Sequence, residues 1–208
     1  MVSISVYVLD TLADWETGFV TAELNSGRFF RKDAGRVSLR TVGLSAEPVT
    51  TMGGMRIVPD CAIDAIVADG ESVLILPGAN TWGEAKHGAV IEKARELLSA
   101  GGTVCAICGA TVALAAAGLL DSRPHTSNGP GFLDMVAPGY TGTAFYVDEP
   151  AVADGNLITA GTTGALPWAR AIIERLGVFS PDTLEYWYSF FSTGRSEDFF
   201  ALMNTVSR

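Results

Sequence analysis

The sequence predicts an α/β protein with a mainly parallel sheet. Two short segments are almost entirely apolar, residues 72–77 (SVLILP) and 103–107 (TVCAI), as expected of central parallel strands that are buried on both faces. Longer segments with helical periodicity separate the apolar runs. Strands that alternate with helices indicate βαβ units rather than an all-β or all-α fold. A length of 208 residues favours one domain.

Local patterns predict the elements of the first half of the chain. Gly53-Gly54 favours the turn of a hairpin, and Asp14 is placed to act as a helix N-cap. Gly101-Gly102 stops an amphipathic helix. In chain order we expect a strand at 3–9, a helix at about 14–30, a strand at 37–42, a hairpin at 49–60, a strand at 72–76 and a helix at 84–100.

The second half continues the same alternation. Pro167 falls in the first turn of a predicted helix, where its missing N–H costs least. In chain order we expect a strand at 103–107, a helix at 110–117, a loop at 127–139, strands at 141–147 and 156–160, and a helix within 162–176. The aromatic-rich segment 181–208 is expected to be a helical extension docked on the body. Its apolar surface favours a homodimer.

Charge and composition exclude several classes of function. The chain has 14 Lys+Arg against 23 Asp+Glu, a formal net charge of −9, which disfavours nucleic acid and anionic membranes as partners. Residues 103–120 carry no charge and approach the ~20 residues that span a bilayer. This run changes from β-branched to alanine-rich at Cys108-Gly109, which favours a strand, a turn and a helix of a soluble protein.

The cysteines and the N-terminus favour a cytoplasmic protein. Cys61, Cys105 and Cys108 are too few for a disulfide scaffold, and reduced thiols fit them better. The N-terminal residues MVSISVYVLD lack the basic and long apolar regions of a secretory signal.

Cys108 is the best candidate for a chemical role. It lies where an apolar strand meets a helix of small residues (VCAICGAT), the arrangement of a nucleophile elbow. A helix N-terminus also favours the thiolate. The alternative is a buried structural cysteine. Cys105 and Cys108 form a C-x-x-C, but along a strand they lie ~10 Å apart, too far for a disulfide. We expect neither a redox pair nor a zinc site, and Cys105 belongs to the core.

An acid and a turn of small residues share the expected sheet edge with Cys108. Glu16 opens the helix after the first strand, and Gly78-Ala79-Asn80 follows the strand at 72–76. The carboxyl ends of parallel strands are where α/β proteins place ligands. Backbone N–H groups of the turn can face an oxyanion. The alternatives are an acid that complements the helix dipole and an ordinary β-turn.

Histidine chemistry is limited by the presence of only two histidines. His87 is expected on an exposed helix, in contact with solvent. His125 approaches the sheet edge and is the only candidate base, although it equally fits a structural histidine.

Four segments together resemble the ThiJ/PfpI superfamily. They are ADWET, LPGAN, AICGAT and VADGNLITAGTTGALPWARAIIERL, and the resemblance runs in order from about residue 3 to residue 178. It implies a class I glutamine amidotransferase-like, flavodoxin-like three-layer sandwich, with helices on both faces of the sheet.

The resemblance also implies roles for single residues. Cys108 would be the elbow cysteine, Glu16 the acid that hydrogen-bonds its sulfur, and Gly109 and Ala79 the oxyanion donors. The chain departs from the family at the third catalytic position. Asn128 stands where many members have histidine, and His125 lies three residues earlier. The small pocket is expected to be lined by Trp15, Gly78, Asn80, Trp82 and Asn128.

Three functions remain open. The first is a small-molecule hydrolase, hydratase or amidase that uses Cys108 and Glu16. The second is a non-catalytic oxidative-stress sensor that uses the same cysteine, since an exposed thiolate is readily oxidised. The third is a structural or interaction protein. Peptide hydrolysis is disfavoured because the leaving amine needs a proton donor placed by a triad. The expected partner is a small-molecule substrate or oxidant, and the sequence predicts no metal and no cofactor.

Overall fold

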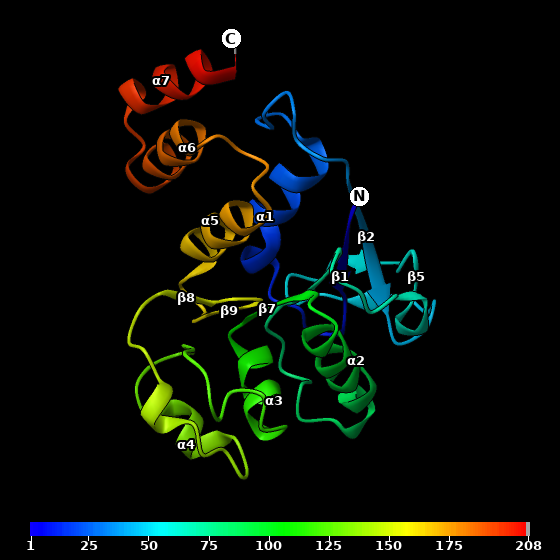
Figure 1. The fold of residues 1–208 in the computed structure, drawn as a ribbon. Helices are drawn as coiled ribbons and strands as arrows, with labels where there is room; N and C mark the ends of the chain where they lie inside the picture. The colour runs from blue at the N-terminus through cyan, green and yellow to red at the C-terminus, as the bar shows by residue number, and fades with distance from the viewer. Residues whose placement is uncertain (207–208) are drawn as a thin grey trace.

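A central sheet of seven strands carries helices on both faces, in a computed structural model that describes residues 1–206 (Figure 1). The neighbouring strands are parallel except at one edge, where the last pair is antiparallel. The predicted α/β fold is therefore confirmed. In spatial order the strands are β5 (Cys61–Ala62), β2 (Val37–Gly43), β1 (Val2–Tyr7), β6 (Ser72–Leu76), β7 (Thr103–Ile107), β9 (Leu157–Ala160) and β8 (Ala151–Asp154).

Side chains of the central strands point alternately to the two faces of the sheet and so belong to two separate hydrophobic cores. Leu74 and Leu76 of β6 pack into the core on one face, and Val73 and Ile75 pack into the core on the other, because successive strand side chains point to opposite faces. Every residue of β6 and β7 is buried, as their apolar sequences predict. The first core is covered by α2 (Gly88–Ser99) and α3 (Gly109–Ala116), and the second by α1 (Asp14–Ser26) and α5 (Ala165–Leu176).

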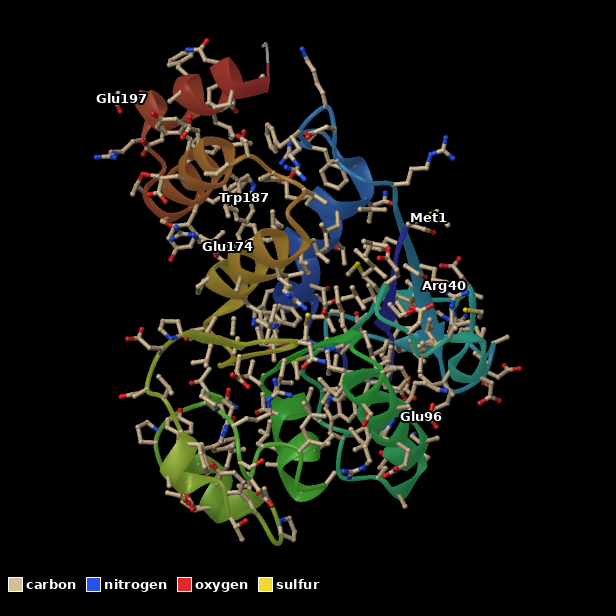
Figure 2. All side chains as sticks on the ribbon, viewed as in Figure 1. Met1, Arg40, Glu96, Glu174, Trp187 and Glu197 are labelled. Carbon is tan, nitrogen blue, oxygen red and sulfur yellow. The ribbon has the colours of Figure 1, made fainter. Side chains whose placement is uncertain are left out.

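The C-terminal segment forms two helices, α6 (Pro181–Thr193) and α7 (Ser196–Val206). Ser180 caps α6 by accepting a hydrogen bond from the Thr183 N–H. Trp187 lies between α6 and the body (Figure 2), fully buried, and its indole N–H donates to the buried carboxylate of Glu23 at 3.0 Å. This contact joins α6 to α1. Residues 207–208 of the predicted extension lie outside the described residues.

Two predicted helices begin or end at other positions. The helix expected to reach residue 30 ends at Ser26, because Gly27 adopts the left-handed conformation (φ 61°) and its N–H caps the helix. Asp14 is not the N-cap; Ala13 takes that position, and the Asp14 carboxylate instead accepts the Gly53 N–H at 2.6 Å. That bond fastens α1 to the predicted hairpin, which is present as β3 (Val49–Thr50) and β4 (Arg56–Ile57). The helix expected from residue 84 begins at Gly88, after a 3₁₀ turn.

The segment between α3 and α5 differs most from the prediction. The expected strand at 141–147 is absent from the described residues. A 3₁₀ turn occupies its centre, and the residue after this turn, Tyr146, forms a single isolated β-bridge with His125. The turn is closed by hydrogen bonds from the Phe145 N–H to the Gly142 carbonyl and from the Tyr146 N–H to the Thr143 carbonyl. Gly142 also packs against the Leu120 carbonyl, where a Cβ would lie only 2.5 Å away. The expected loop at 127–139 contains a short helix, and the edge strand β8 was not predicted. The remaining elements are α4 (Phe132–Val136), η1 (Ile63–Ala65), η2 (Ala85–His87) and η3 (Thr143–Phe145).

Among the described residues, no helix combines the length and the apolar character needed to cross a bilayer.

Candidate active site

Cys108 adopts a strained backbone conformation at the end of β7. Its φ is 56° and its ψ is −121°, a region that residues with a side chain rarely occupy and that costs roughly 1–3 kcal/mol. Its N–H continues the sheet by donating to the Ala160 carbonyl at 2.9 Å, and the next residue opens α3. A sharp turn from strand to helix with a strained nucleophile is the geometry of an elbow.

Two glycines make room for the elbow. A Cβ on Gly109 would lie 2.8 Å from the Ala79 carbonyl oxygen. A Cβ on Gly78 would lie 2.6 Å from a Glu16 carboxylate oxygen and 2.8 Å from the Cβ of Cys108. Glu16 and Cys108 therefore border the same small space, and only a glycine at position 78 leaves it open.

The hydroxyl groups of Thr111 and Ser127 stabilise the elbow through hydrogen bonds. The Thr111 hydroxyl lies 2.6 Å from the Cys108 carbonyl oxygen and 2.6 Å from the Ser127 hydroxyl. Thr111 and Ser127 are both buried. The Cys108 carbonyl is thus linked to α3 through Thr111 and, through Thr111, to Ser127 in the segment that follows α3.

Glu16 projects from the first turn of α1 and is completely buried. One carboxylate oxygen accepts the Gly78 N–H at 2.6 Å, and the other accepts the Thr162 hydroxyl at 3.2 Å. Burial raises the pKa of Glu16, while the hydrogen bonds from Gly78, Thr162 and the Cys108 thiol act in the opposite direction. A carboxyl group of this kind holds a proton more readily than an exposed glutamate.

Asn128 supplies the side chain that faces the sulfur. Its amide nitrogen lies 3.5 Å from the Cys108 Sγ, and its amide oxygen accepts the Thr162 N–H at 2.9 Å. The second bond fixes which end of the amide faces the sulfur. The position that holds histidine in many members of the family is therefore occupied here by an asparagine, whose amide N–H faces the sulfur as a hydrogen-bond donor and cannot act as a base.

Thr162 was not among the predicted site residues. It contacts Glu16 through its hydroxyl and Asn128 through its N–H, and its side chain also hydrogen-bonds Cys108. The available signal was its position just after β9, whose carboxyl end lies beside that of β7.

Burial raises the pKa of the Cys108 thiol, and the negative charge of Glu16 raises it further. Hydrogen bonds from the Asn128 amide, the Thr162 hydroxyl and the Gly109 N–H lower it, but the net direction is upward. This differs from the expectation that the helix end favours the thiolate. The reason is that the sequence does not show how deeply the turn buries the sulfur. The two groups also act on each other, because the charge of Glu16 raises the pKa of Cys108 and the hydrogen bond from the Cys108 thiol lowers the pKa of Glu16.

The predicted oxyanion donors lie next to each other. Gly109 is the first residue of α3, so its N–H has no partner within the helix, and it points toward the Cys108 sulfur. A Cβ on Gly109 would be 3.4 Å from the Ala79 nitrogen. The two nitrogens therefore lie near the nucleophile, and their role as oxyanion donors stays a prediction.

Neither histidine is placed to act on Cys108. His125 is fully buried, with Nδ1 2.8 Å from the Arg123 carbonyl and Nε2 2.7 Å from the Tyr140 hydroxyl. Both ring nitrogens are therefore occupied. The prediction that His87 contacts solvent is wrong, since it is only 2% exposed and bonds the Tyr7 hydroxyl at 2.7 Å. The 3₁₀ turn before α2 directs its ring inward.

Of the remaining predicted pocket residues, Trp82 lies beside the elbow, since a Cβ on Gly109 would be 3.3 Å from its Cδ1. Asn80 is exposed, and its N–H donates to the Thr11 hydroxyl. Trp82 is buried, with its indole N–H bonded to the Pro77 carbonyl at 2.8 Å. Trp15 is 54% exposed and borders an open hollow at the hairpin tip.

The other cysteines lie apart from this chemistry. Cys105 is fully buried inside β7, and burial raises its pKa strongly, so it remains a thiol. Cys61 is partly exposed in the edge strand β5. Within residues 1–206, no group of three His, Cys, Asp or Glu side chains is arranged to bind a metal ion.

The fold and this site define an α/β protein with a cysteine on a nucleophile elbow and a buried glutamate beside it. The sequence model of the DJ-1/PfpI family matches residues 2–175, and the chain belongs to this family. The resemblance stated from the motifs is confirmed.

Individual relatives agree with this assignment. The chain is 46% identical to the "Uncharacterized protease YoaZ" of Bacillus subtilis, over 98% of this chain and 97% of the relative. It is 30% identical to the "Glutathione-independent glyoxalase DJR-1.2" of Caenorhabditis elegans, over 68% of this chain and 75% of the relative. The crystal structure of a thiJ/pfpI family protein from Bacillus anthracis superposes with a TM-score of 0.96 at 44% identity, over 99% of this chain and 97% of that one.

Proposed function

We propose that the protein is a Cys108-dependent hydrolase, hydratase or amidase that acts on a small electrophilic molecule, with Glu16 as its acid–base partner. The observation that carries this proposal is the shared space at Gly78, where a Cβ would lie within 3 Å of both the Cys108 side chain and the Glu16 carboxylate. A nucleophile and a proton carrier held this close can act in one step.

The proposed step starts from a thiol and an ionised Glu16. As Sγ forms a bond to an electrophilic carbon, the thiol proton passes to the Glu16 carboxylate. The raised pKa makes Glu16 a better base than an exposed glutamate. The charge that develops on the substrate heteroatom is stabilised by the N–H groups of Gly109 and Ala79. Glu16 then gives the proton to the substrate heteroatom, which leaves as the amine when the substrate is an amide and stays in the product when the substrate is hydrated. Water adds to the same carbon, the C–S bond breaks, and the proton that the water loses returns to the sulfur as the thiol.

The absence of a histidine at the sulfur favours small substrates over peptides. In the described residues, the polar groups that interact with the Cys108 thiol are those of Asn128, Thr162, Glu16 and Gly109. Expulsion of an amine needs a proton donor at the leaving group, and the candidate donor, Glu16, is completely buried. An amide substrate must therefore be small enough to enter the space that Glu16 and Cys108 share at Gly78, which a peptide is not. The name of the glyoxalase relative supports a carbonyl compound as the substrate class.

Turnover of a panel of small electrophiles tests the proposal. The panel contains methylglyoxal, a short aliphatic amide and an isocyanide. We expect at least one to be converted, with the activity lost in Cys108→Ser and retained in Cys61→Ser, which removes a thiol outside the site. Conversion that survives Cys108→Ser contradicts the proposal.

An oxidative-stress sensor is the second candidate, because three donors converge on the sulfur. The Asn128 amide, the Thr162 hydroxyl and the Gly109 N–H are suited to hold the oxygens of a cysteine sulfinate. This alternative predicts selective oxidation of Cys108 by peroxide, while Cys61 and Cys105 stay reduced, and no turnover of the panel.

We further propose a cytoplasmic homodimer. Exposed aromatic side chains on α6 and α7 support self-association, with Phe200 64% exposed. Sedimentation at several protein concentrations tests the dimer. A single monomeric species at all concentrations contradicts it.

A further inference from the structure

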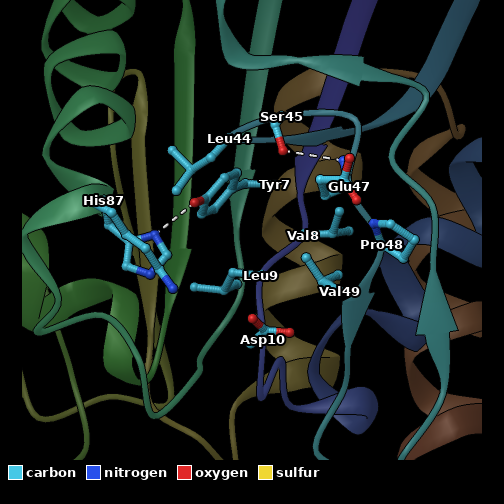
Figure 3. A pocket seen from close by; sticks show the side chains of 11 residues that line it. Tyr7, Val8, Leu9, Asp10, Leu44, Ser45, Glu47, Pro48, Val49 and His87 are labelled. Carbon is cyan, nitrogen blue, oxygen red and sulfur yellow. Dashed lines mark hydrogen bonds between the residues drawn. The ribbon is translucent and has the colours of Figure 1, made fainter.

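The proton of the Cys108 thiol has to leave when the sulfur attacks a substrate, and neither histidine is placed to take it. His87 bonds the Tyr7 hydroxyl at 2.7 Å, as the dashed line in Figure 3 shows. Both ring nitrogens of His125 are bonded within the chain. The first acceptor of the thiol proton therefore has to be another side chain.

The polar groups around the sulfur include two donors and two acceptors. The Asn128 amide nitrogen and the Gly109 N–H both donate to the sulfur, and neither can accept a proton from it. Among the polar groups that the described residues bring to the Cys108 thiol, those that can accept are the Thr162 hydroxyl and the Glu16 carboxylate. The thiol proton therefore passes to one of these two side chains.

Both oxygens of the Glu16 carboxylate already face a donor. Oε2 accepts the backbone N–H of Gly78 at 2.6 Å, and Oε1 accepts the Thr162 hydroxyl at 3.2 Å. The backbone N–H cannot turn away, so a proton on Oε2 would be directed at another proton. When Glu16 is neutral, its proton is therefore on Oε1 and faces the Thr162 oxygen.

The Thr162 hydroxyl can donate one hydrogen bond and accept others. While Glu16 is ionised, the hydroxyl donates to Oε1 and its lone pairs can accept the S–H of Cys108. While Glu16 is neutral, Oε1 donates to the hydroxyl, whose own proton can then face the sulfur. The hydrogen-bonded chain from Sγ through Oγ1 to Oε1 is complete in both states, with its direction reversed. A proton that passed directly from Sγ to Oε1 would instead meet the hydroxyl proton of Thr162.

We infer that Thr162 relays the proton between Cys108 and Glu16, an inference that rests on the proposed acid–base function of this pair. As Sγ forms a bond to the substrate carbon, the S–H bond breaks and its proton forms an O–H bond with Thr162 Oγ1. The proton that the hydroxyl carried before passes to Glu16 Oε1. Thr162 ends with one proton, as it began, and Glu16 ends neutral.

A double-mutant cycle tests the relay, with the pH midpoint of Cys108 alkylation by iodoacetamide as the measurement. In Glu16→Gln, the side-chain carbonyl accepts the Gly78 N–H, so the amide NH₂ faces Thr162 as a neutral carboxyl group does. The hydroxyl then donates to the sulfur. In this background we expect Thr162→Val to raise the midpoint by about 1 pH unit.

In the wild-type background the hydroxyl donates to ionised Glu16, and Thr162→Val should raise the midpoint by less than about 0.3 pH unit. Equal shifts in the two backgrounds are what a purely structural threonine gives, and they overturn the relay. Thr162→Ser keeps the hydroxyl and should retain the wild-type midpoint in both backgrounds. Thr163→Val changes the exposed neighbouring threonine and is the matched control.

The alkylation measurement needs no substrate and separates the relay from the function on which it rests. If Glu16→Gln alone leaves the midpoint unchanged, the acid–base pair fails and the relay with it. If Glu16→Gln shifts the midpoint but the cycle is additive, only the relay fails. Circular dichroism verifies the fold of each variant, and Thr162→Ala replaces Thr162→Val in the cycle if valine is not accommodated.

Turnover gives a second measurement on any compound of the panel that is converted. Thr162→Val should lower kcat roughly 10–100-fold with little change in KM, because the relay acts on proton transfer and not on binding. Thr162→Ser should retain most of the activity. An unchanged kcat in Thr162→Val overturns the relay.

Discussion

Gly78→Ala is expected to destabilise the protein and disturb the candidate site at once. The added Cβ would lie 2.6 Å from the Glu16 carboxylate and 2.8 Å from the Cys108 Cβ, both closer than non-bonded atoms approach. The Cys108 Cβ is held by the strained backbone of the elbow, and the Glu16 side chain is completely buried, so neither can move away from the added methyl group. Overpacking of this kind costs roughly 1–3 kcal/mol. For a chain of this length, 2 kcal/mol corresponds to a fall in Tm of roughly 4–8 °C.

Gly83→Ala is the matched control. Gly83 lies a few residues further along, its φ lies outside the left-handed region, and a Cβ there meets nothing within 4 Å. Thermal unfolding followed by circular dichroism gives both Tm values, and alkylation by iodoacetamide reports the state of Cys108. We expect Gly83→Ala to match the wild type and Gly78→Ala to change both measurements. Equal Tm values and equal alkylation rates for the two variants would refute the packing argument.

Three further predictions follow from single contacts. Asn128→Ala removes the amide 3.5 Å from the sulfur and should raise the pKa of Cys108 further; an unchanged midpoint of alkylation against pH contradicts this. Burial raises the pKa of Glu16 above its ordinary 4.5, so the folded state binds this proton more tightly, and stability falls as pH rises from 4.5 through the raised value. Urea unfolding should show that Glu16→Gln lacks this slope. Trp187→Phe removes the hydrogen bond to Glu23 and should cost about 1–3 kcal/mol in urea unfolding; a loss below about 0.5 kcal/mol contradicts the contact.

Local chemistry in the sequence was enough to predict the centre of the fold. The apolar runs of β6 and β7 are buried on both faces, as parallel strands require. The change from such a strand to a helix of small residues at Cys108 predicted the sharp turn that the backbone angles show. These features depend on neighbouring residues, so the sequence displays them directly.

Contacts between distant segments could not be predicted in this way. Glu16 and Thr162 are joined by a hydrogen bond across 146 positions, and Trp187 and Glu23 across 164. Each residue taken alone has an ordinary local explanation. His87 shows the same limit: its neighbours Lys86 and Gly88 suggest an exposed helix, but the partner that holds it inside, Tyr7, lies 80 positions away.

The pH dependence of Cys108 alkylation in the wild type and in Glu16→Gln tests the central claim most directly. Peptide mass spectrometry separates Cys108 from Cys61 and Cys105. If the two groups interact, the charge of ionised Glu16 raises the pKa of Cys108, so the wild-type alkylation rate rises at a higher pH than it would without that charge. Glu16→Gln removes the charge, so its rate should rise at a lower pH. Superimposable profiles would contradict the coupling, and with it the assignment of Glu16 as the proton carrier of Cys108.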